Sequence, residues 1–340
     1  MSGNEAPADS AAPIAVLGAG SWGTALAIQF ARTGHPTLLW GRDAAQLAAM
    51  AAARRNARYL PEATFPESLV VEADLARALA RAADLLIAVP SHAFRATLEA
   101  LRPLVGPRTR IAWATKGFEL GTGRLPHEVA REVLGAEVPI AVLSGPTFAA
   151  EVGRGLPTAM TVASPDAAFA DSLAKTLSGQ NFRAYTTPDI VGVEVGGAVK
   201  NVLAIGTGIA DGMGYGANTR IALITRGLAE MTRLGLALGA RRETFMGLAA
   251  LGDLVLTCTD DQSRNRRFGL AIASGKSAAE AQTLIGQVVE GVHAARAVRA
   301  VATRAGVEMP IAEQVYSVLH EGRDVRAAVR SLMSRELRQE

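Results

Sequence analysis

Short apolar runs alternate with longer stretches of helical periodicity through the first half of the chain. The apolar runs cover residues 14–17, 37–40, 84–89, 110–114 and 139–143. Each has the length of a strand buried on both faces. Residues 23–33, 44–55, 75–82 and 126–133 instead place apolar side chains at helical spacing. This alternation predicts an α/β domain of the Rossmann type, with a doubly wound parallel sheet and crossover helices.

The pattern changes near residue 190, and no strand-like run follows. We expect helices over residues 191–213, 219–238, 242–249, 263–274, 277–286, 291–305, 310–322 and 325–332. The predicted organisation is a disordered lead-in over residues 1–12, a sheet domain over 13–192 and an all-helical domain over 193–335.

Composition narrows the class of protein. A chain of 340 residues suits two domains, and its net charge of +3 is too weak and too mixed for a nucleic-acid binder. The only cysteine, Cys258, leaves no intramolecular disulfide and indicates a reducing compartment. The first dozen residues lack a signal-peptide pattern, and no run of about 18 apolar residues would span a membrane. We therefore expect a cytoplasmic protein.

A glycine-rich turn follows the first predicted strand. Gly18, Gly20 and Gly23 form a G-x-G-x-x-G string that opens a helix, which is the context that dinucleotide binding requires. Gly18 would permit the tight turn, Gly20 the approach of a pyrophosphate, and Gly23 close packing of helix and strand. The helix N-terminus would then supply amides to the phosphates.

The end of the second strand selects the ribose in such domains. Here Arg42 could bind a 2′-phosphate through its planar guanidinium, whereas Asp43 could bind a 2′-hydroxyl. We favour NADP on the strength of Arg42, with NAD as the alternative. A solvated pair of turn residues would look the same.

Polar residues also follow two later strands, where ligands of parallel sheets bind. Lys116 lies just beyond one strand end and could contact an anion or a carbonyl, although a surface lysine is the plainer interpretation. The segment 144–148, Ser-Gly-Pro-Thr-Phe, follows the next strand and could equally be a simple turn.

Lys200 stands inside a long apolar helix, next to Asn201. A buried lysine is costly unless it is paired or neutralised, and burial lowers its pKa into a range useful for proton transfer. The side chain could instead reach the surface along the helix. Gly196 and Gly197, one turn earlier, favour the close approach of backbone or ligand.

Two further segments carry polar residues on an apolar background. Asp253 could orient a lysine or simply cap a helix. Ser263, Arg264 and Asn265 could form a phosphate clamp at a helix start, or a solvated basic face. The scattered histidines have no metal-ligand spacing, so we expect no metal. Nucleophile-elbow and P-loop strings are also lacking, which argues against hydrolase and phosphoryl-transfer chemistry.

Taken together, these segments resemble the bacterial NAD(P)-dependent glycerol-3-phosphate dehydrogenases. The resemblance rests on six motifs in the family's order, together with the segment Gln287–Gly291, and it covers about residues 14–330. The motifs are 18–27, 115–119, 144–148, 194–205, 251–254 and 263–265.

The resemblance implies an oxidoreductase that transfers hydride reversibly between NAD(P)H and dihydroxyacetone phosphate. The product, sn-glycerol 3-phosphate, would serve glycerophospholipid synthesis. It implies Lys200 as the proton donor and acceptor, with Lys116 and Asp253 as its catalytic partners. Substrate positions would be Lys116, Gly145, Thr147, Lys200, Asp253, Ser263, Arg264 and Asn265. Cofactor positions would be Gly18, Gly20, Ser21, Trp22, Gly23, Arg42, Lys116, Ala149, Arg264, Val288 and Glu290.

Thr257 falls near the phosphate site of the eukaryotic relatives, which is a weaker correspondence. A homodimer is compatible with the sequence but is not fixed by it. The nearest rival is a β-hydroxyacid or ketopantoate-type reductase, whose substrate carries a carboxylate; the segments 115–117 and 263–265 argue against it. A non-catalytic nucleotide sensor is disfavoured by the cost of Lys200 and Asp253 in apolar surroundings.

Overall fold

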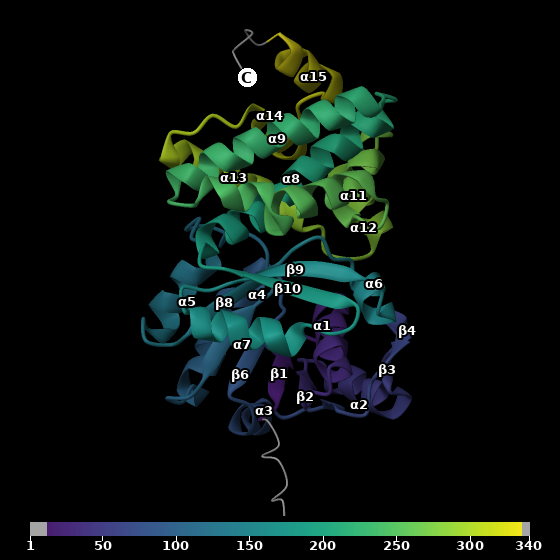
Figure 1. The fold of residues 1–340 in the computed structure, drawn as a ribbon. Helices are drawn as coiled ribbons and strands as arrows, with labels where there is room; N and C mark the ends of the chain where they lie inside the picture. The colour runs from purple at the N-terminus through teal and green to yellow at the C-terminus, as the bar shows by residue number, and fades with distance from the viewer. Residues whose placement is uncertain (1–11, 335–340) are drawn as a thin grey trace, which may run out of the picture.

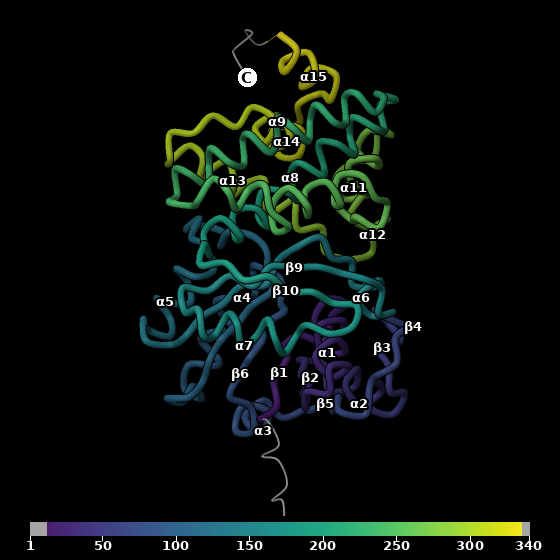
Figure 2. The backbone as a smooth tube through the Cα atoms, viewed as in Figure 1, coloured from purple at the N-terminus to yellow at the C-terminus, as the bar shows by residue number. Residues whose placement is uncertain are grey.

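The computed structural model describes residues 12–334. Except for Ala12, the predicted lead-in over residues 1–12 lies outside these residues. The described chain forms two layers: a sheet with its helices, and a helical domain stacked on it (Figure 1). The tube in Figure 2 shows the chain entering the helical domain along α8 after the last strand.

The sheet has eight strands in the order β10-β9-β8-β7-β6-β1-β2-β5. They are β1 (Ile14–Leu17), β2 (Thr37–Trp40), β5 (Leu69–Val71), β6 (Asp84–Ile87), β7 (Arg110–Trp113), β8 (Ile140–Ser144), β9 (Thr158–Ala163) and β10 (Phe182–Thr187). A separate hairpin pairs β3 (Arg55–Asn56) with β4 (Leu60–Thr64).

The helices of the sheet domain are α1 (Ser21–Arg32), α2 (Ala44–Ala53), α3 (Leu75–Arg81), α4 (Ser91–Leu101), α5 (Pro126–Leu134), α6 (Ala149–Arg154) and α7 (Ala167–Leu177), with a 3₁₀ turn η1 (Arg102–Leu104). Beyond β10 follow α8 (Ile190–Gly212), α9 (Ala217–Ala237), the 3₁₀ turn η2 (Arg242–Met246), the π turn η3 (Leu248–Gly252), α10 (Asp253–Thr259), α11 (Arg264–Ala273), α12 (Ala278–Ile285), α13 (Glu290–Ala305), α14 (Pro310–His320) and α15 (Val325–Met333).

The predicted α/β class is confirmed, with one difference in strand direction. Neighbouring strands are parallel across the sheet from β5 to β8. Strand β9 runs antiparallel to β8, and β10 runs parallel to β9. The sequence pattern missed both strands because β9 carries Thr, and β10 carries Thr and Arg, among their apolar residues, as strands with a partly exposed face do. The pattern also missed β5 and the short hairpin.

Side chains of each central strand alternate between the two faces of the sheet. In β1, Ile14 and Val16 join the core beneath α1 and α7, whereas Ala15 and Leu17 join the core beneath α4 and α5. This burial on both faces accounts for the continuous apolar runs.

The predicted helical half is confirmed, and one of its segments is irregular. Residues 242–249 were expected to form a helix, but they divide into the 3₁₀ turn η2 and the start of the π turn η3. Gly247 between them has extended backbone, which ends the first turn. The π turn leads directly into α10, so Asp253 is the first residue of that helix.

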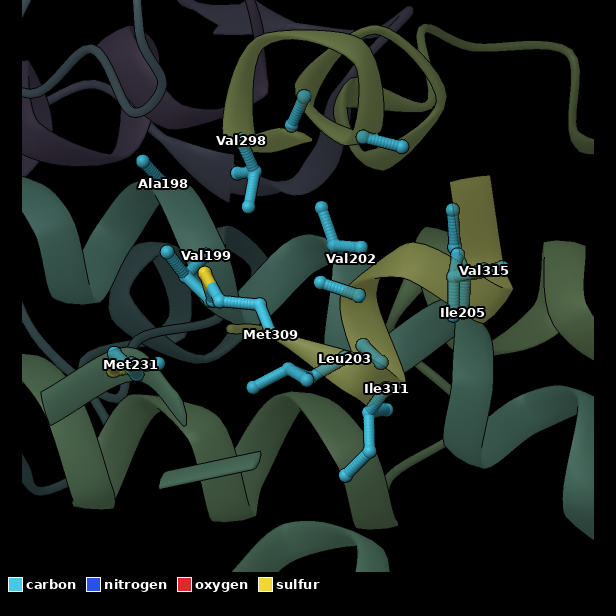
Figure 3. Packing of buried hydrophobic residues seen from close by; sticks show 14 of the residues in the cluster. Ala198, Val199, Val202, Leu203, Ile205, Met231, Val298, Met309, Ile311 and Val315 are labelled. Atoms are coloured by element: carbon cyan, nitrogen blue, oxygen red, sulfur yellow. The ribbon is translucent and has the colours of Figure 1, made fainter. Parts of the chain in front are cut away.

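Helix α8 is the core of the helical domain. Its side chains Ala198, Val199, Val202, Leu203 and Ile205 interdigitate with side chains from α9, α13 and α14, as Figure 3 shows. Among the described residues it is also the one helix with the length and hydropathy of a membrane span, yet 89% of that window is buried inside the protein. Packing against its neighbours accounts for its apolar composition.

Candidate active site

A buried carboxylate joins two lysines from different domains. Asp253 is 1% exposed, and its Oδ2 accepts a hydrogen bond of 2.6 Å from Lys116 Nζ. Its Oδ1 accepts a second from Lys200 Nζ. Lys116 follows β7 at the carboxyl edge of the sheet, whereas Lys200 lies in the middle of α8. The structure therefore brings together the two lysines and the acid that the sequence singled out.

Thr257 completes the surroundings of Lys200. Its Oγ1 accepts a hydrogen bond of 3.0 Å from Lys200 Nζ and donates one of 2.6 Å to the Asp253 carbonyl oxygen, one turn earlier in α10. Lys200 is 7% exposed, so it does not reach solvent along the helix as the plainer interpretation proposed.

Burial and charge act in opposite directions on this group. Burial lowers the pKa of the Lys200 ammonium to about 7; Asp253 opposes the shift, and the nearby Lys116 charge adds to it. For Asp253, burial alone would raise the pKa, but the two ammonium groups outweigh that effect and lower it. The site thus pairs an ionised acid with a lysine that exchanges its proton near neutral pH.

Two glycines in α8 allow this approach. A Cβ on Gly196 would lie 2.8 Å from the Ala249 carbonyl oxygen, so only glycine lets the π turn pack directly on α8 and deliver Asp253 to Lys200. A Cβ on Gly197 would lie 3.4 Å from both Lys116 Cγ and Ser144 Oγ. Lys116 therefore passes over α8 one turn before Lys200.

The glycine turn has the geometry of a phosphate site. Gly18 has a φ of 128°, which favours glycine, and a Cβ there would lie 2.4 Å from the Ala88 carbonyl oxygen. A Cβ on Gly23 would overlap the Gly18 carbonyl oxygen at 1.9 Å. By contrast, the space beside Gly20 is open for 4 Å, at the start of α1 where no side chain caps the amides. These features fit a bound pyrophosphate.

The other predicted cofactor positions flank this turn. Ser21 and Trp22 begin α1, and the buried Trp22 Nε1 has no hydrogen-bond partner among the described residues. Arg42 is exposed beyond β2. Asp43 caps α2, because its Oδ1 accepts a hydrogen bond of 3.0 Å from the Gln46 amide. Ala149 begins α6, near the β8 end.

Residues of α11 and α13 form a second cluster. Arg264 Nη1 lies 3.4 Å from Gln287 Oε1, and burial lowers the pKa of Arg264 while the Glu290 charge opposes the shift. Glu290 in turn accepts 3.3 Å from Ser91 Oγ at the start of α4, in the sheet domain. Val288 is 38% exposed beside them. This cluster links the two domains a second time.

Ser263 and Asn265 are partly used by the fold. Ser263 Oγ caps α11 by accepting from the Arg266 amide at 3.2 Å, which leaves its own proton to donate. Asn265 Oδ1 accepts from the Gly291 amide at 2.9 Å, and Asn265 Nδ2 donates to Asn201 Oδ1 at 2.9 Å with one proton left. Through Asn201 the cluster adjoins Lys200.

The segment after β8 packs beneath the lysine centre. Thr147 Oγ1 donates 3.2 Å to the Gly145 carbonyl oxygen, and a Cβ on Gly145 would lie 2.8 Å from Met160 Cα of β9. Gly252, just before Asp253, lies close to Pro146: a Cβ added to Gly252 would be 3.5 Å from Pro146 Cγ. The loop therefore adjoins the π turn.

Sequence reasoning assigned no role to Glu194. In the structure it is a second buried acid, in addition to Asp253, and it lies in α8. Glu194 Oε1 accepts from Trp113 Nε1 at 3.1 Å and from the His127 amide at 3.0 Å, and Oε2 lies 2.6 Å from His127 Nδ1. Trp113 ends β7, three residues before Lys116. The signal was available, since an acid in an apolar helix is as unusual as the lysine. No group of three metal-ligating side chains occurs in residues 12–334.

Comparisons with known proteins agree with this geometry. The model of the NAD-dependent glycerol-3-phosphate dehydrogenase N-terminus matches residues 13–170, and that of the C-terminus matches 189–330. The glycerol-3-phosphate dehydrogenase [NAD(P)+] of Edwardsiella ictaluri is 58% identical over 330 residues, 97% of this chain and 98% of that protein. The Serratia marcescens enzyme of the same name is 57% identical over 331 residues, 97% of each chain.

Solved structures give the same picture. The crystal structure of glycerol-3-phosphate dehydrogenase from Coxiella burnetii is 51% identical, with a TM-score of 0.92 over 95% of this chain and 99% of that one. The 2-dehydropantoate 2-reductase of Geobacter metallireducens, of the rival class, is 18% identical with a TM-score of 0.60, over 92% of this chain and all of that one, and shares the fold alone.

Proposed function

The chain belongs to the NAD-dependent glycerol-3-phosphate dehydrogenase family, and we propose that it catalyses reversible hydride transfer between NAD(P)H and dihydroxyacetone phosphate, giving sn-glycerol 3-phosphate. The buried Lys116–Asp253–Lys200 cluster carries this proposal. The cluster contains Lys116 of the sheet domain and adjoins the Arg264 cluster through Asn201 and Asn265. This position supports a substrate that binds between the sheet domain and the Arg264 cluster.

Lys200 is the proton donor in the direction of ketone reduction. Negative charge develops on the carbonyl oxygen as the ketone is reduced, and a desolvated ammonium with a pKa of about 7 both stabilises that charge and gives up its proton. Lys116 supplies a second positive charge to the same oxygen. Asp253 holds both ammonium groups in place through its two oxygens.

The remaining residues bind and orient. Arg264, Ser263 and Asn265 hold the substrate phosphate through the donors that the fold leaves unused, with Gly145 and Thr147 lining the site. Binding energy from that phosphate positions the ketone, which is remote from it.

For the cofactor, the amides at Gly20, Ser21 and Trp22 hold the pyrophosphate, together with Gly18 and Gly23. Arg42 holds a ribose 2′-phosphate, so NADP is favoured over NAD. Ala149, Val288, Glu290, Lys116 and Arg264 contact the remainder of the dinucleotide.

We further propose that residues 13–192 hold most of the cofactor and that residues 193–335 supply most of the substrate site. In this proposal the enzyme acts in the cytoplasm and supplies glycerophospholipid synthesis, and a homodimer is compatible with the sequence without being fixed by it. The single cysteine, which leaves no intramolecular disulfide, supports the cytoplasmic location.

One assay tests the proposal. Purified protein is given dihydroxyacetone phosphate or unphosphorylated dihydroxyacetone with NADPH or NADH, and cofactor oxidation is followed. We expect turnover to need the phosphate, and Lys200→Ala to abolish turnover while NADPH binding stays near normal. Lys175→Ala, at an exposed lysine of α7, is the matched control. Substantial residual activity in Lys200→Ala, or equal rates on both ketones, contradicts the proposal.

A further inference from the structure

Ser144 has a buried hydroxyl that the fold leaves unsatisfied. The residue ends β8 and is 1% exposed, and its Oγ has no hydrogen-bond partner among the described residues. Buried hydroxyls in native proteins nearly always have a hydrogen-bond partner, because a buried polar group without one costs free energy. Ser164, equally buried and one strand away, donates 2.6 Å to the Ile140 carbonyl oxygen. A buried hydroxyl without a partner, beside one that has a partner, indicates a hydrogen bond that forms when a ligand binds.

The surroundings of Ser144 place that partner at the reaction centre. Its Oγ and Lys116 Cγ would both lie 3.4 Å from a Cβ on Gly197, so the hydroxyl stands against a bare patch of α8 beside the Lys116 chain. Gly197 precedes Lys200 by three residues, and residues at that spacing are neighbours on a helix, about 5–6 Å apart. The Ser144 hydroxyl and the Lys116 stem therefore face the same glycine of α8, three residues before Lys200.

The chemistry of a three-carbon ketose phosphate leaves one group to assign. Under the proposed function, the phosphate faces Arg264 and its neighbours, and the ketone oxygen faces the two lysines. The terminal hydroxymethyl group, one bond beyond the ketone carbon, has no partner in that scheme. We propose that Ser144 is a specificity-determining residue whose hydroxyl hydrogen-bonds the substrate's terminal hydroxymethyl group. This inference rests on the proposed function.

A cycle of two proteins and two substrates tests it. Wild type and Ser144→Ala are compared on dihydroxyacetone phosphate and on hydroxyacetone phosphate, which carries a methyl group in place of the hydroxymethyl group. A site built to bind a hydroxyl rejects the analogue that lacks it. We expect wild type to prefer dihydroxyacetone phosphate by about tenfold or more in kcat/KM, and Ser144→Ala to lose most of that preference while keeping its rate on the methyl analogue within about twofold.

Stability measurements separate this role from a structural one. Ser144→Ala removes no hydrogen bond within the protein, so its melting temperature should stay close to that of wild type. Ser164→Ala, the matched control, removes a made bond and should lower the melting temperature while leaving the substrate preference intact. A Ser144→Ala variant that slows both substrates equally, or changes neither, overturns the inference. Failure of wild type to reduce dihydroxyacetone phosphate would instead overturn the proposed function itself.

Discussion

Replacing Asp253 with Asn should move the pH dependence of ketone reduction toward acid. Asp253 is the one group that raises the pKa of Lys200 against burial and against the Lys116 charge. Asparagine is nearly the same size and can still accept a hydrogen bond, but it removes the negative charge. With only the lowering influences left, Lys200 releases its proton at a lower pH than in wild type.

The size of the effect follows from the site. The fall in the Lys200 pKa from 10.5 to about 7 corresponds to roughly 5 kcal/mol against the charged form, even with Asp253 present. Removing an adjacent opposite charge typically changes a pKa by about 1–3, so loss of the Asp253 charge should lower the pKa of Lys200 by about that much. At pH 7 about half of the wild-type lysines carry a proton, so reduction by Asp253→Asn at that pH should fall between roughly fivefold and several hundredfold.

The assay is kcat/KM for dihydroxyacetone phosphate from about pH 4 to 9, because a pKa lowered by about 1–3 places the variant's inflection at about pH 4–6. Wild-type activity should decline as the pH rises through about 7, and the variant's decline should come at lower pH, with partial recovery of rate in acid. Thr257→Val removes the neutral 3.0 Å contact to Lys200 without changing charge, so its profile should shift little. A variant profile that keeps its inflection, or moves it to higher pH, refutes the argument.

Three further changes probe separate parts of the molecule. Gly196→Ala should lower the free energy of unfolding by about 1–3 kcal/mol and cut turnover at least tenfold, because its Cβ would push the π turn away; Gly197→Ala, with ordinary 3.4 Å contacts, should be milder in chemical denaturation. Arg42→Ala should raise KM for NADPH by about tenfold and leave KM for NADH nearly unchanged, since NADH has no 2′-phosphate for the guanidinium; equal effects on both would argue against that contact. Burial alone would lower the pKa of His127, but Glu194 outweighs it and raises the pKa, so the protonated histidine stabilises the fold below its ordinary pKa of 6.5, and this contribution is lost as pH rises through the raised pKa. Burial raises the pKa of Glu194, so the contribution falls again toward acid as that carboxylate takes up a proton. Urea unfolding of wild type and His127→Asn should therefore differ by roughly 1–3 kcal/mol at pH 6 and by less at pH 9.

Regular elements could be predicted where burial alone determines the residue pattern. Strand β1 is apolar throughout and helix α8 is mostly apolar because the fold surrounds them, and their bounds followed from sequence within a residue or two. Strand β10 was missed because Arg183 and Tyr185 face solvent at the sheet edge, where the pattern is not set by the core. The π turn was missed for another reason: its hydrogen bonding depends on the approach to Gly196, which is a tertiary contact.

The site divides in the same way. Lys200 stood out because a charge inside an apolar helix needs an explanation, and Asp253 stood out for the same reason. Their pairing across 53 residues is a property of the fold, so the sequence left open whether Asp253 caps a helix or binds a lysine. Ser144 was noted only as part of the segment 144–148, which could equally be a simple turn, and the missing hydrogen bond of its hydroxyl exists only in three dimensions.

The sharing of Asp253 between two lysines has a consequence for the order of events. Oδ2 faces the sheet domain and Oδ1 the helical domain, so this one carboxylate both joins the domains and sets the proton affinity of Lys200. In the proposed mechanism both lysines face the same substrate oxygen, so the Lys116 charge stays close to Lys200 when substrate is bound and continues to lower its pKa, against the raising effect of Asp253. Negative charge that develops on the oxygen during reduction then favours transfer of the Lys200 proton to it. Lys200 must take up a proton again before the next reduction, and the Asp253 carboxylate beside it favours that step.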